Sequence, residues 1–267
     1  MAKLKSLKNK PYIVGGIFTI LYVLVLVARS ILFSVLYINF ESINVSGAIY
    51  SILSNLFTSF SSIQILLLVS ICAIAVLMFT KKARLAFVPI SLIIITIIYW
   101  LISDTIWAID SAISFFSSSV DLSVNRIILV IYETVFCIMD SFDLIALSLL
   151  LVTAIGLAGK SAKIKTSKLF VFSTVLAFSN VLLFAFNDFV YELYEMGYIV
   201  NFSTHLDYSV KDIISLCANV ITYFSFALVV LFVGLWMSKS AKIRNASNNP
   251  ESLVSEVYET SENEEVE

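Results

Sequence analysis

Two basic segments punctuate this chain: K-S-A-K-I-K at residues 160–165 returns as K-S-A-K-I-R at residues 239–244. A third cluster, K-K-A-R at residues 81–84, precedes the first segment by the same interval that separates the first from the second. Each of the three follows a long apolar stretch, and lysines also precede the first apolar stretch of the chain. This alternation predicts a chain that crosses a membrane repeatedly and returns each time to one basic side.

The apolar runs are long enough to cross a bilayer as helices. Apolar residues make up 60% of the chain and charged residues only 13%. Six continuous runs of about 18 to 28 residues match a hydrocarbon core roughly 30 Å thick. Continuous runs favour helices, because the strands of a membrane barrel alternate in hydropathy. The six spans are expected near residues 12–36, 61–80, 85–103, 138–158, 169–187 and 214–237.

We therefore expect an all-α, polytopic integral membrane protein whose six transmembrane helices form three hairpins, at about residues 1–83, 84–166 and 167–244. Polar positions also recur at the interval that relates the basic segments. The hairpins could thus be repeats around a pseudo-threefold axis, although recurrent topology without common ancestry accounts for the same pattern. Residues 245–267 carry seven Glu and no Lys or Arg, which predicts a disordered, acidic cytoplasmic tail.

Charge predicts the orientation in the membrane. Of the 17 Lys and Arg residues, 14 lie in the amino-terminal segment or in residues 81–84, 160–168 and 239–244. Those segments hold no Asp or Glu, and the 12 acidic residues before the tail lie elsewhere. The positive-inside rule then places both termini in the cytoplasm of a multi-pass cell-membrane protein, and the residue usage suggests a bacterium. The first apolar run is too long for a cleaved signal peptide and is expected to remain as an anchor.

Polar residues occur at one depth in all six expected helices. Counted from the basic boundary at about 1.5 Å per residue, this depth is about 24–30 Å. Ionisable groups there are costly unless they are paired or wetted, so they are the first candidates for function. Glu133, Asp140 and Asp143 are also spaced to share one helical face. The candidate binding residues are Arg29, Gln64, Asp104, Glu133, Asp140, Asp143, Asp188 and Asn219.

Three arrangements could accommodate these charges. A charge pair between Arg29 and Asp140 or Asp143 would let all three tolerate lipid surroundings. The acids could instead line a vestibule, open to the outside, that admits a small cation or a cationic peptide. They could also lie just above the hydrocarbon and be solvated. Asn180 lies deeper in an apolar helix and is expected to make an interhelical hydrogen bond rather than bind a ligand.

Signatures of enzymes, metal sites and cofactors are missing from the sequence. The single histidine, His205, is expected in an outer loop, and Cys72, Cys137 and Cys217 lie in apolar runs without C-x-x-C spacing. We therefore expect no metal site, disulfide or cofactor, and the missing glycine-rich phosphate loops argue against nucleotide use. We expect no enzyme, although facing aspartates could serve an intramembrane hydrolase. The basic segments are expected to meet anionic lipid rather than nucleic acid.

The sequence leaves two hypotheses about function. The leading hypothesis is a membrane protein that binds or passes a small cationic solute through an outward-facing polar vestibule built from the candidate residues. The alternative is a non-transporting accessory or immunity-type protein that contacts a membrane protein partner through its helices and outer segments. A vestibule would be wet, whereas a packed scaffold would hold the same side chains dry and paired.

Overall fold

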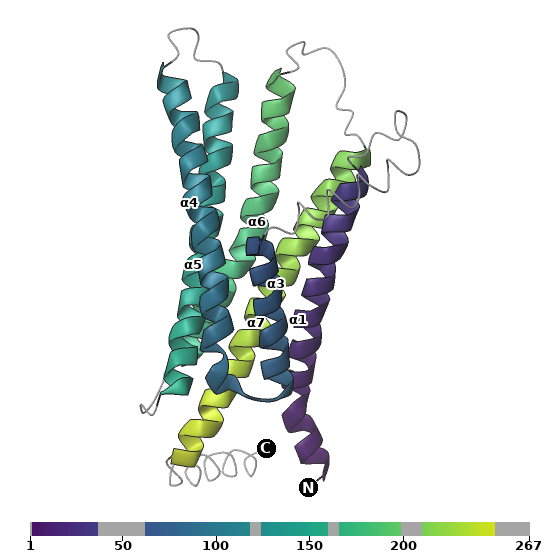
Figure 1. Cartoon of the computed structure of the whole chain (residues 1–267), viewed down its shortest axis with the longest axis vertical. Helices are drawn as coiled ribbons and strands as arrows, with labels where there is room; N and C mark the ends of the chain where they lie inside the picture. The colour runs from purple at the N-terminus through teal and green to yellow at the C-terminus, as the bar shows by residue number, and fades with distance from the viewer. Residues whose placement is uncertain (1, 37–61, 118–123, 160–165, 199–209, 249–267) are drawn as a thin grey trace, which may run out of the picture.

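The computed structural model describes residues 2–36, 62–117, 124–159, 166–198 and 210–248 (Figure 1). Within these residues every element is a helix, which confirms the all-α prediction. The elements are α1 (Ala2–Leu36), α3 (Ser62–Phe79), the short 3-10 helix η1 (Ala83–Leu85), α4 (Phe87–Ser117), α5 (Val124–Ala158), α6 (Thr166–Tyr198) and α7 (Val210–Asn248).

Five of the described helices, α1, α4, α5, α6 and α7, are long and apolar enough to cross a membrane. The 18 residues of α3 extend over about 27 Å, close to the roughly 30 Å of a hydrocarbon core. Large apolar side chains cover the outside of the bundle, with Leu182 74%, Ile106 61% and Val69 59% exposed. Such a surface would be unfavourable in water and is what lipid contact requires.

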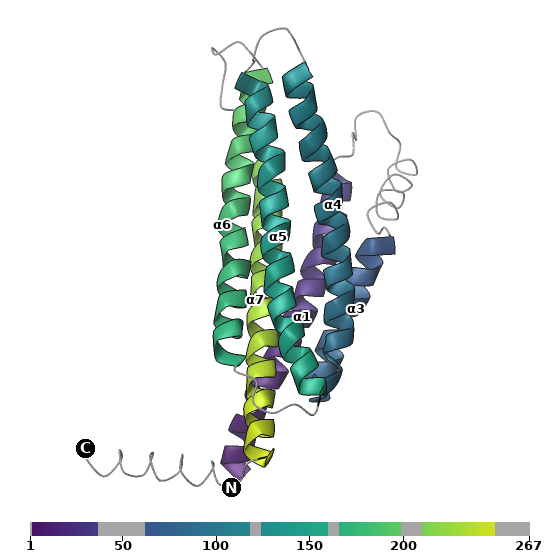
Figure 2. The ribbon, with the colours of Figure 1, turned by 90° about the vertical axis from the view of Figure 1, so that its left-hand side faces the viewer.

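The six long helices close a ring in the order of the chain. Each helix packs against the next one, α7 packs against α1, and α5 also contacts α7 (Figure 2). The start of α1 and the end of α7 lie at the same end of the bundle, where α3 also ends and α4 begins (Figure 1). This end is basic, because Lys81, Lys82, Arg84 and Arg244 surround one cavity there.

Polar side chains join α6 to α5 inside the apolar core. The Asn180 Nδ2 donates a hydrogen bond of 2.8 Å to the carbonyl of Met139, which confirms its expected interhelical role. The Ser173 hydroxyl donates another, of 2.9 Å, to the carbonyl of Ala146. Both side chains are buried, with exposures of 2% and 0%. These bonds hold α6 against α5, the helix that carries Asp140 and Asp143.

Small residues bring helices into close contact at three positions, Gly15, Gly16 and Ala154. A Cβ atom on Gly15 would overlap Met78 of α3, and one on Gly16 would overlap Phe79. Ala154 of α5 is fully buried. Ala158, at the end of the same helix, is exposed and makes no such contact.

Several helices continue beyond the expected spans. The α5 helix begins at Val124 rather than near residue 138, α4 extends to Ser117 and α6 to Tyr198. The reason is that hydropathy marks the length that lies in lipid, whereas a helix continues while its backbone hydrogen bonds and packing persist. Residues 245–248 of the predicted tail belong to α7, and residues 249–267, like the basic segment at 160–165, lie outside the described residues.

The basic segment at residues 239–244 also has a structural role. The Arg244 guanidinium donates hydrogen bonds of 2.9 Å to the carbonyls of Gly156 and Leu157, and it contacts the carbonyl of Gly159 as well. These carbonyls belong to the carboxyl end of α5, where the helix leaves its last acceptors without partners. A cation there also complements the helix dipole, so Arg244 fastens α7 to the end of α5.

Candidate functional site

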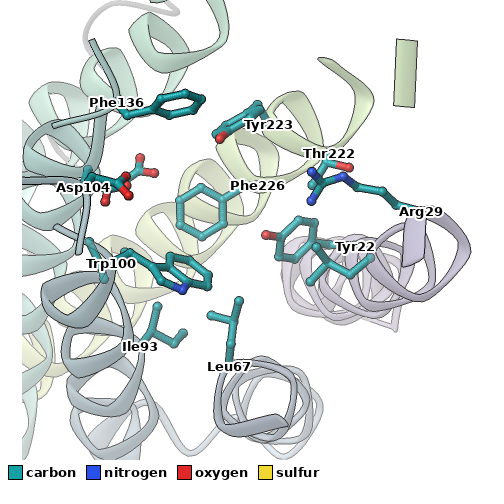
Figure 3. A pocket seen from close by; sticks show the side chains of 14 residues that line it. Tyr22, Arg29, Leu67, Ile93, Trp100, Asp104, Phe136, Thr222, Tyr223 and Phe226 are labelled. Carbon is teal, nitrogen blue, oxygen red and sulfur yellow. The ribbon is translucent and has the colours of Figure 1, made fainter. Parts of the chain in front are cut away.

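A cavity of about 260 Å³ lies between α1, α3, α4, α5 and α7. Four charged side chains line it: Arg29, Asp104, Asp140 and Asp143. Figure 3 shows Arg29 on one side of the space and Asp104 on the other. The cavity thus has a basic side on α1 and an acidic side on α4 and α5, and we refer to it as the polar cavity.

Three carboxyl groups form the acidic side of the polar cavity. The carboxyl groups of Asp104 and Asp140 lie within hydrogen-bonding reach of each other. Two carboxylates this close repel unless a proton or a cation lies between them. Asp143 is only 9% exposed, and its carboxyl interacts with the Asn180 side chain. Its Oδ1 nevertheless has no hydrogen-bond partner within the part of the chain that the structure describes.

Asn219 holds Arg29 in place on the opposite side. The Arg29 Nε donates a hydrogen bond of 2.8 Å to the Asn219 Oδ1 on α7, and the guanidinium carbon lies 5.2 Å from the ring centroid of Phe33. The end of the guanidinium points into the cavity (Figure 3). Over the described residues, no ion pair joins Arg29 to Asp140 or Asp143. The charge pair considered from the sequence is therefore not formed, because an amide rather than a carboxylate holds the guanidinium.

Aromatic side chains make up much of the remaining surface. Two of them are fixed by neighbouring rings: Tyr22 packs against Phe226 with the ring centroids 5.7 Å apart, and Tyr223 stacks on Phe184 of α6 at 4.6 Å. An aromatic face attracts a cation through its quadrupole, most strongly where water is excluded. The aromatic lining consists of Tyr22, Trp100, Phe136, Tyr223 and Phe226.

The eight predicted site residues separate into three groups. Arg29, Asp104, Asp140 and Asp143 line the polar cavity. Asn219 acts through Arg29, and Glu133 is close enough to Asp104 to interact with it electrostatically. Gln64 on α3 and Asp188 on α6 are not among the residues that line the cavity. Gln64 and Asp188 were grouped with the others by depth alone, but α3 and α6 do not bring them into the cavity lining.

Counting depth along the helices does not identify the aromatic lining, but the spacing of aromatic and charged residues in the sequence does indicate it. Trp100 precedes Asp104 by four residues, and Phe136 precedes Asp140 by the same spacing. Tyr22 precedes Arg29 by seven residues. Spacings of four and seven place side chains on one helical face. An aromatic residue therefore lies one or two turns from three of the four charged residues, on the face that carries the charge.

No family model, curated protein or solved structure matches the chain. Its function must therefore be argued from the geometry of the site.

The arrangement of the aspartates bears on the intramembrane hydrolase considered from the sequence. An intramembrane hydrolase would need two facing aspartates, and Asp104 and Asp140 do face each other. Bulky aromatic side chains, those of Trp100 and Phe136, line the cavity one turn from the two aspartates. Described residues also form no group of three or more His, Cys, Asp or Glu that could hold a metal ion. A cavity with carboxyl groups and aromatic faces can instead hold an organic cation.

Proposed function

We propose that this chain is a multi-pass cell-membrane protein that binds or passes a small cationic solute through the polar cavity. The observation that carries the proposal is the acidic side of the cavity. Three carboxyl groups line that side, two of them within hydrogen-bonding reach of each other, and no basic side chain pairs with Asp140 or Asp143 in the described part of the chain. A bound cation would supply the missing positive charge, and the aromatic faces would stabilise its hydrocarbon part.

The proposed topology has six spans in three hairpins, with both termini in the cytoplasm. It is supported by the basic end of the bundle, where α1 starts and α7 ends, together with the positive-inside rule. On this orientation Asp104, counted along α4 from Arg84, lies about 30 Å from the cytoplasmic edge. The polar cavity would then open toward the outer surface, as a vestibule requires.

The test is the binding of a simple organic cation. We expect hexylammonium, titrated into the full-length protein in nanodiscs and followed by calorimetry, to bind with an affinity that depends on the acidic side. Asp143→Asn should weaken binding about tenfold or more, because a hydrogen bond to a charged group contributes about 1.5–3 kcal/mol. Asp140→Asn should act in the same direction and serves as a second variant.

The matched control is Asp110→Asn, which removes the same charge from an exposed position of α4 outside the cavity. Partition of hexylammonium into lipid affects every variant equally, so the comparison isolates the cavity. Equal affinity in the wild type, Asp143→Asn and Asp110→Asn would contradict the proposal. Elution and thermal unfolding like those of the wild type would exclude a folding defect as the cause of lost binding.

A partner-binding role is the second candidate, and one surface feature favours it. The outer part of α4 exposes Ile109 (54%) and Ile113 (59%). Counted from Arg84, they lie about 37 and 43 Å from the cytoplasmic edge, beyond the roughly 30 Å hydrocarbon core. Exposed apolar side chains outside the core are typical of a protein contact. On this hypothesis the polar cavity stays closed and dry, and hexylammonium does not bind.

A further inference from the structure

The ligand class can be narrowed further, on the basis of the proposed function. We infer that the polar cavity binds a zwitterion: an ammonium group on the acidic side and an acidic group at Arg29, separated by a short hydrocarbon. This assigns to Arg29 a direct part in binding, which a purely cationic solute would not require. A cationic ligand alone would in fact be repelled by the guanidinium.

Both charged sides of the cavity are built to receive a ligand. On the acidic side, Asp143 lines the cavity and is 9% exposed, and its buried Oδ1 has no hydrogen-bond partner among the described residues. A buried acceptor without a donor is costly, and a bound ammonium would satisfy it. On the other side, Asn219 occupies the Arg29 Nε, so that the end of the guanidinium is directed into the cavity (Figure 3). A fixed guanidinium suits a carboxylate or phosphate oxygen.

The region between the two sides is largely aromatic. Tyr22 and Tyr223 each interact electrostatically with both Arg29 and Asp143, so these rings lie within reach of both charges. Figure 3 shows Phe226 between the Asp104 side and the Arg29 side. A hydrocarbon spacer would contact these rings and bury apolar surface. The volume of about 260 Å³ is slightly below the roughly 300–1,000 Å³ of sites for drug-sized molecules, which restricts the ligand to a small solute or a single head group.

The experiment compares three probes of the same length by calorimetry: 6-aminohexanoate, hexylammonium and hexanoate. Each is titrated into the full-length protein in nanodiscs of phosphatidylglycerol. We expect 6-aminohexanoate to bind about tenfold tighter than hexylammonium, the factor that one charge-assisted hydrogen bond provides, and hexanoate to bind more weakly than either. Arg29→Gln should abolish the advantage of 6-aminohexanoate without weakening hexylammonium, whereas Arg84→Gln, at an exposed position of the basic end, should change neither.

Asn219→Ala is the second variant, because it keeps the Arg29 charge and removes the group that positions it. It should reduce the advantage of 6-aminohexanoate while the protein remains folded. If hexylammonium binds as tightly as 6-aminohexanoate and Arg29→Gln has no effect, the zwitterion inference is overturned and the cation-binding proposal stands. If none of the three probes binds to folded protein, both are overturned.

The same chemistry could come from a free solute or from the head group of phosphatidylethanolamine, which joins an ammonium to a phosphate. Repeating the titration in nanodiscs that contain phosphatidylethanolamine separates the two sources. Competition that lowers the apparent affinity for 6-aminohexanoate assigns the site to the lipid head group. An unchanged affinity assigns it to a soluble zwitterion.

Discussion

At the scale of single residues, Asn180 and Asp143 are buried polar side chains on neighbouring helices, and each has one side-chain oxygen without a partner among the described residues. The Asn180 Nδ2 donates to the Met139 carbonyl across the α5–α6 interface. The Asp143 Oδ1, near the same interface, has no donor in the described part of the chain. Because the Asn180 Nδ2 joins the two helices whereas Asp143 lines the polar cavity, we interpret Asn180 as structural and Asp143 as a binding group.

Asn180→Ala should therefore lower stability without removing a charge from the cavity. We expect the free energy of unfolding to fall by about 1 kcal/mol, the size of an interhelical hydrogen bond in a membrane. Ser179→Ala is the control, since the Ser179 hydroxyl bonds to the Val175 carbonyl of its own helix. Reversible unfolding in mixed detergent micelles measures the difference. A loss no larger for Asn180→Ala than for Ser179→Ala would refute the structural role.

The sequence predicts the charged residues of the site, but not which side chains bond to each other. Counting residues from the basic boundary selects Arg29, Asp104, Asp140 and Asp143, all of which line the cavity. The same count cannot show that Asn219 would hold Arg29, because two side chains at one depth meet only if both helices are turned toward each other. That rotation depends on the packing of the whole ring. For the same reason depth also selected Gln64 and Asp188.

At the scale of elements, the end of α5 depends on α7. Arg244→Gln should destabilise the protein by about 1–2 kcal/mol, because carbonyls at the α5 terminus lose a charged donor and the helix dipole loses a cation. Lys242→Gln removes a charge from an exposed position nearby on α7 and should stay within about 0.5 kcal/mol of the wild type. Thermal unfolding compares them. Equal midpoints for the two variants would show that Arg244 has no such role.

Apolar runs locate the cores of the helices better than their ends. The run at 61–80 corresponds closely to α3, Ser62–Phe79, because α3 ends at a turn where Lys81 adopts a φ of 57°. The α5 helix, by contrast, begins at Val124, well before the run at 138–158 that predicted it. Its early residues include Asn125, Arg126 and Glu133, which lower hydropathy without preventing a helix. A helix end that is marked by a turn can be predicted from the sequence, whereas the end of a helix that extends beyond the lipid cannot.

At the scale of the whole molecule, the ring of helices creates the polar cavity. The charges of Arg29, Asp104 and Asp140 come from three helices, and α1 reaches this set because α7 packs against it and closes the ring. The sequence predicts all-α architecture and the apolar spans, but it cannot predict ring closure, since contacts between the first and last helices leave no local pattern. Our main proposal requires that water fills this cavity from outside the membrane.

Water access to α5 tests that claim most directly. Asp140 and Asp143 would each be changed to Cys after removal of the native Cys72, Cys137 and Cys217, and an impermeant thiol reagent would be added outside intact cells. The account predicts labelling at both positions. The matched controls on α5 are Ile138→Cys and Ile145→Cys, at positions 41% and 45% exposed toward the outside of the bundle, which should stay unlabelled in lipid.

Two further positions check the orientation in the same experiment. Ile109→Cys on the outer part of α4 should react from outside, and Lys242→Cys at the basic end should react only after the cells are permeabilised. When those two controls react in this way, we expect labelling at positions 140 and 143 but not at 138 and 145. Unlabelled Cys at 140 and 143 alongside a reactive Cys at 109 would contradict an outward-facing, water-filled cavity.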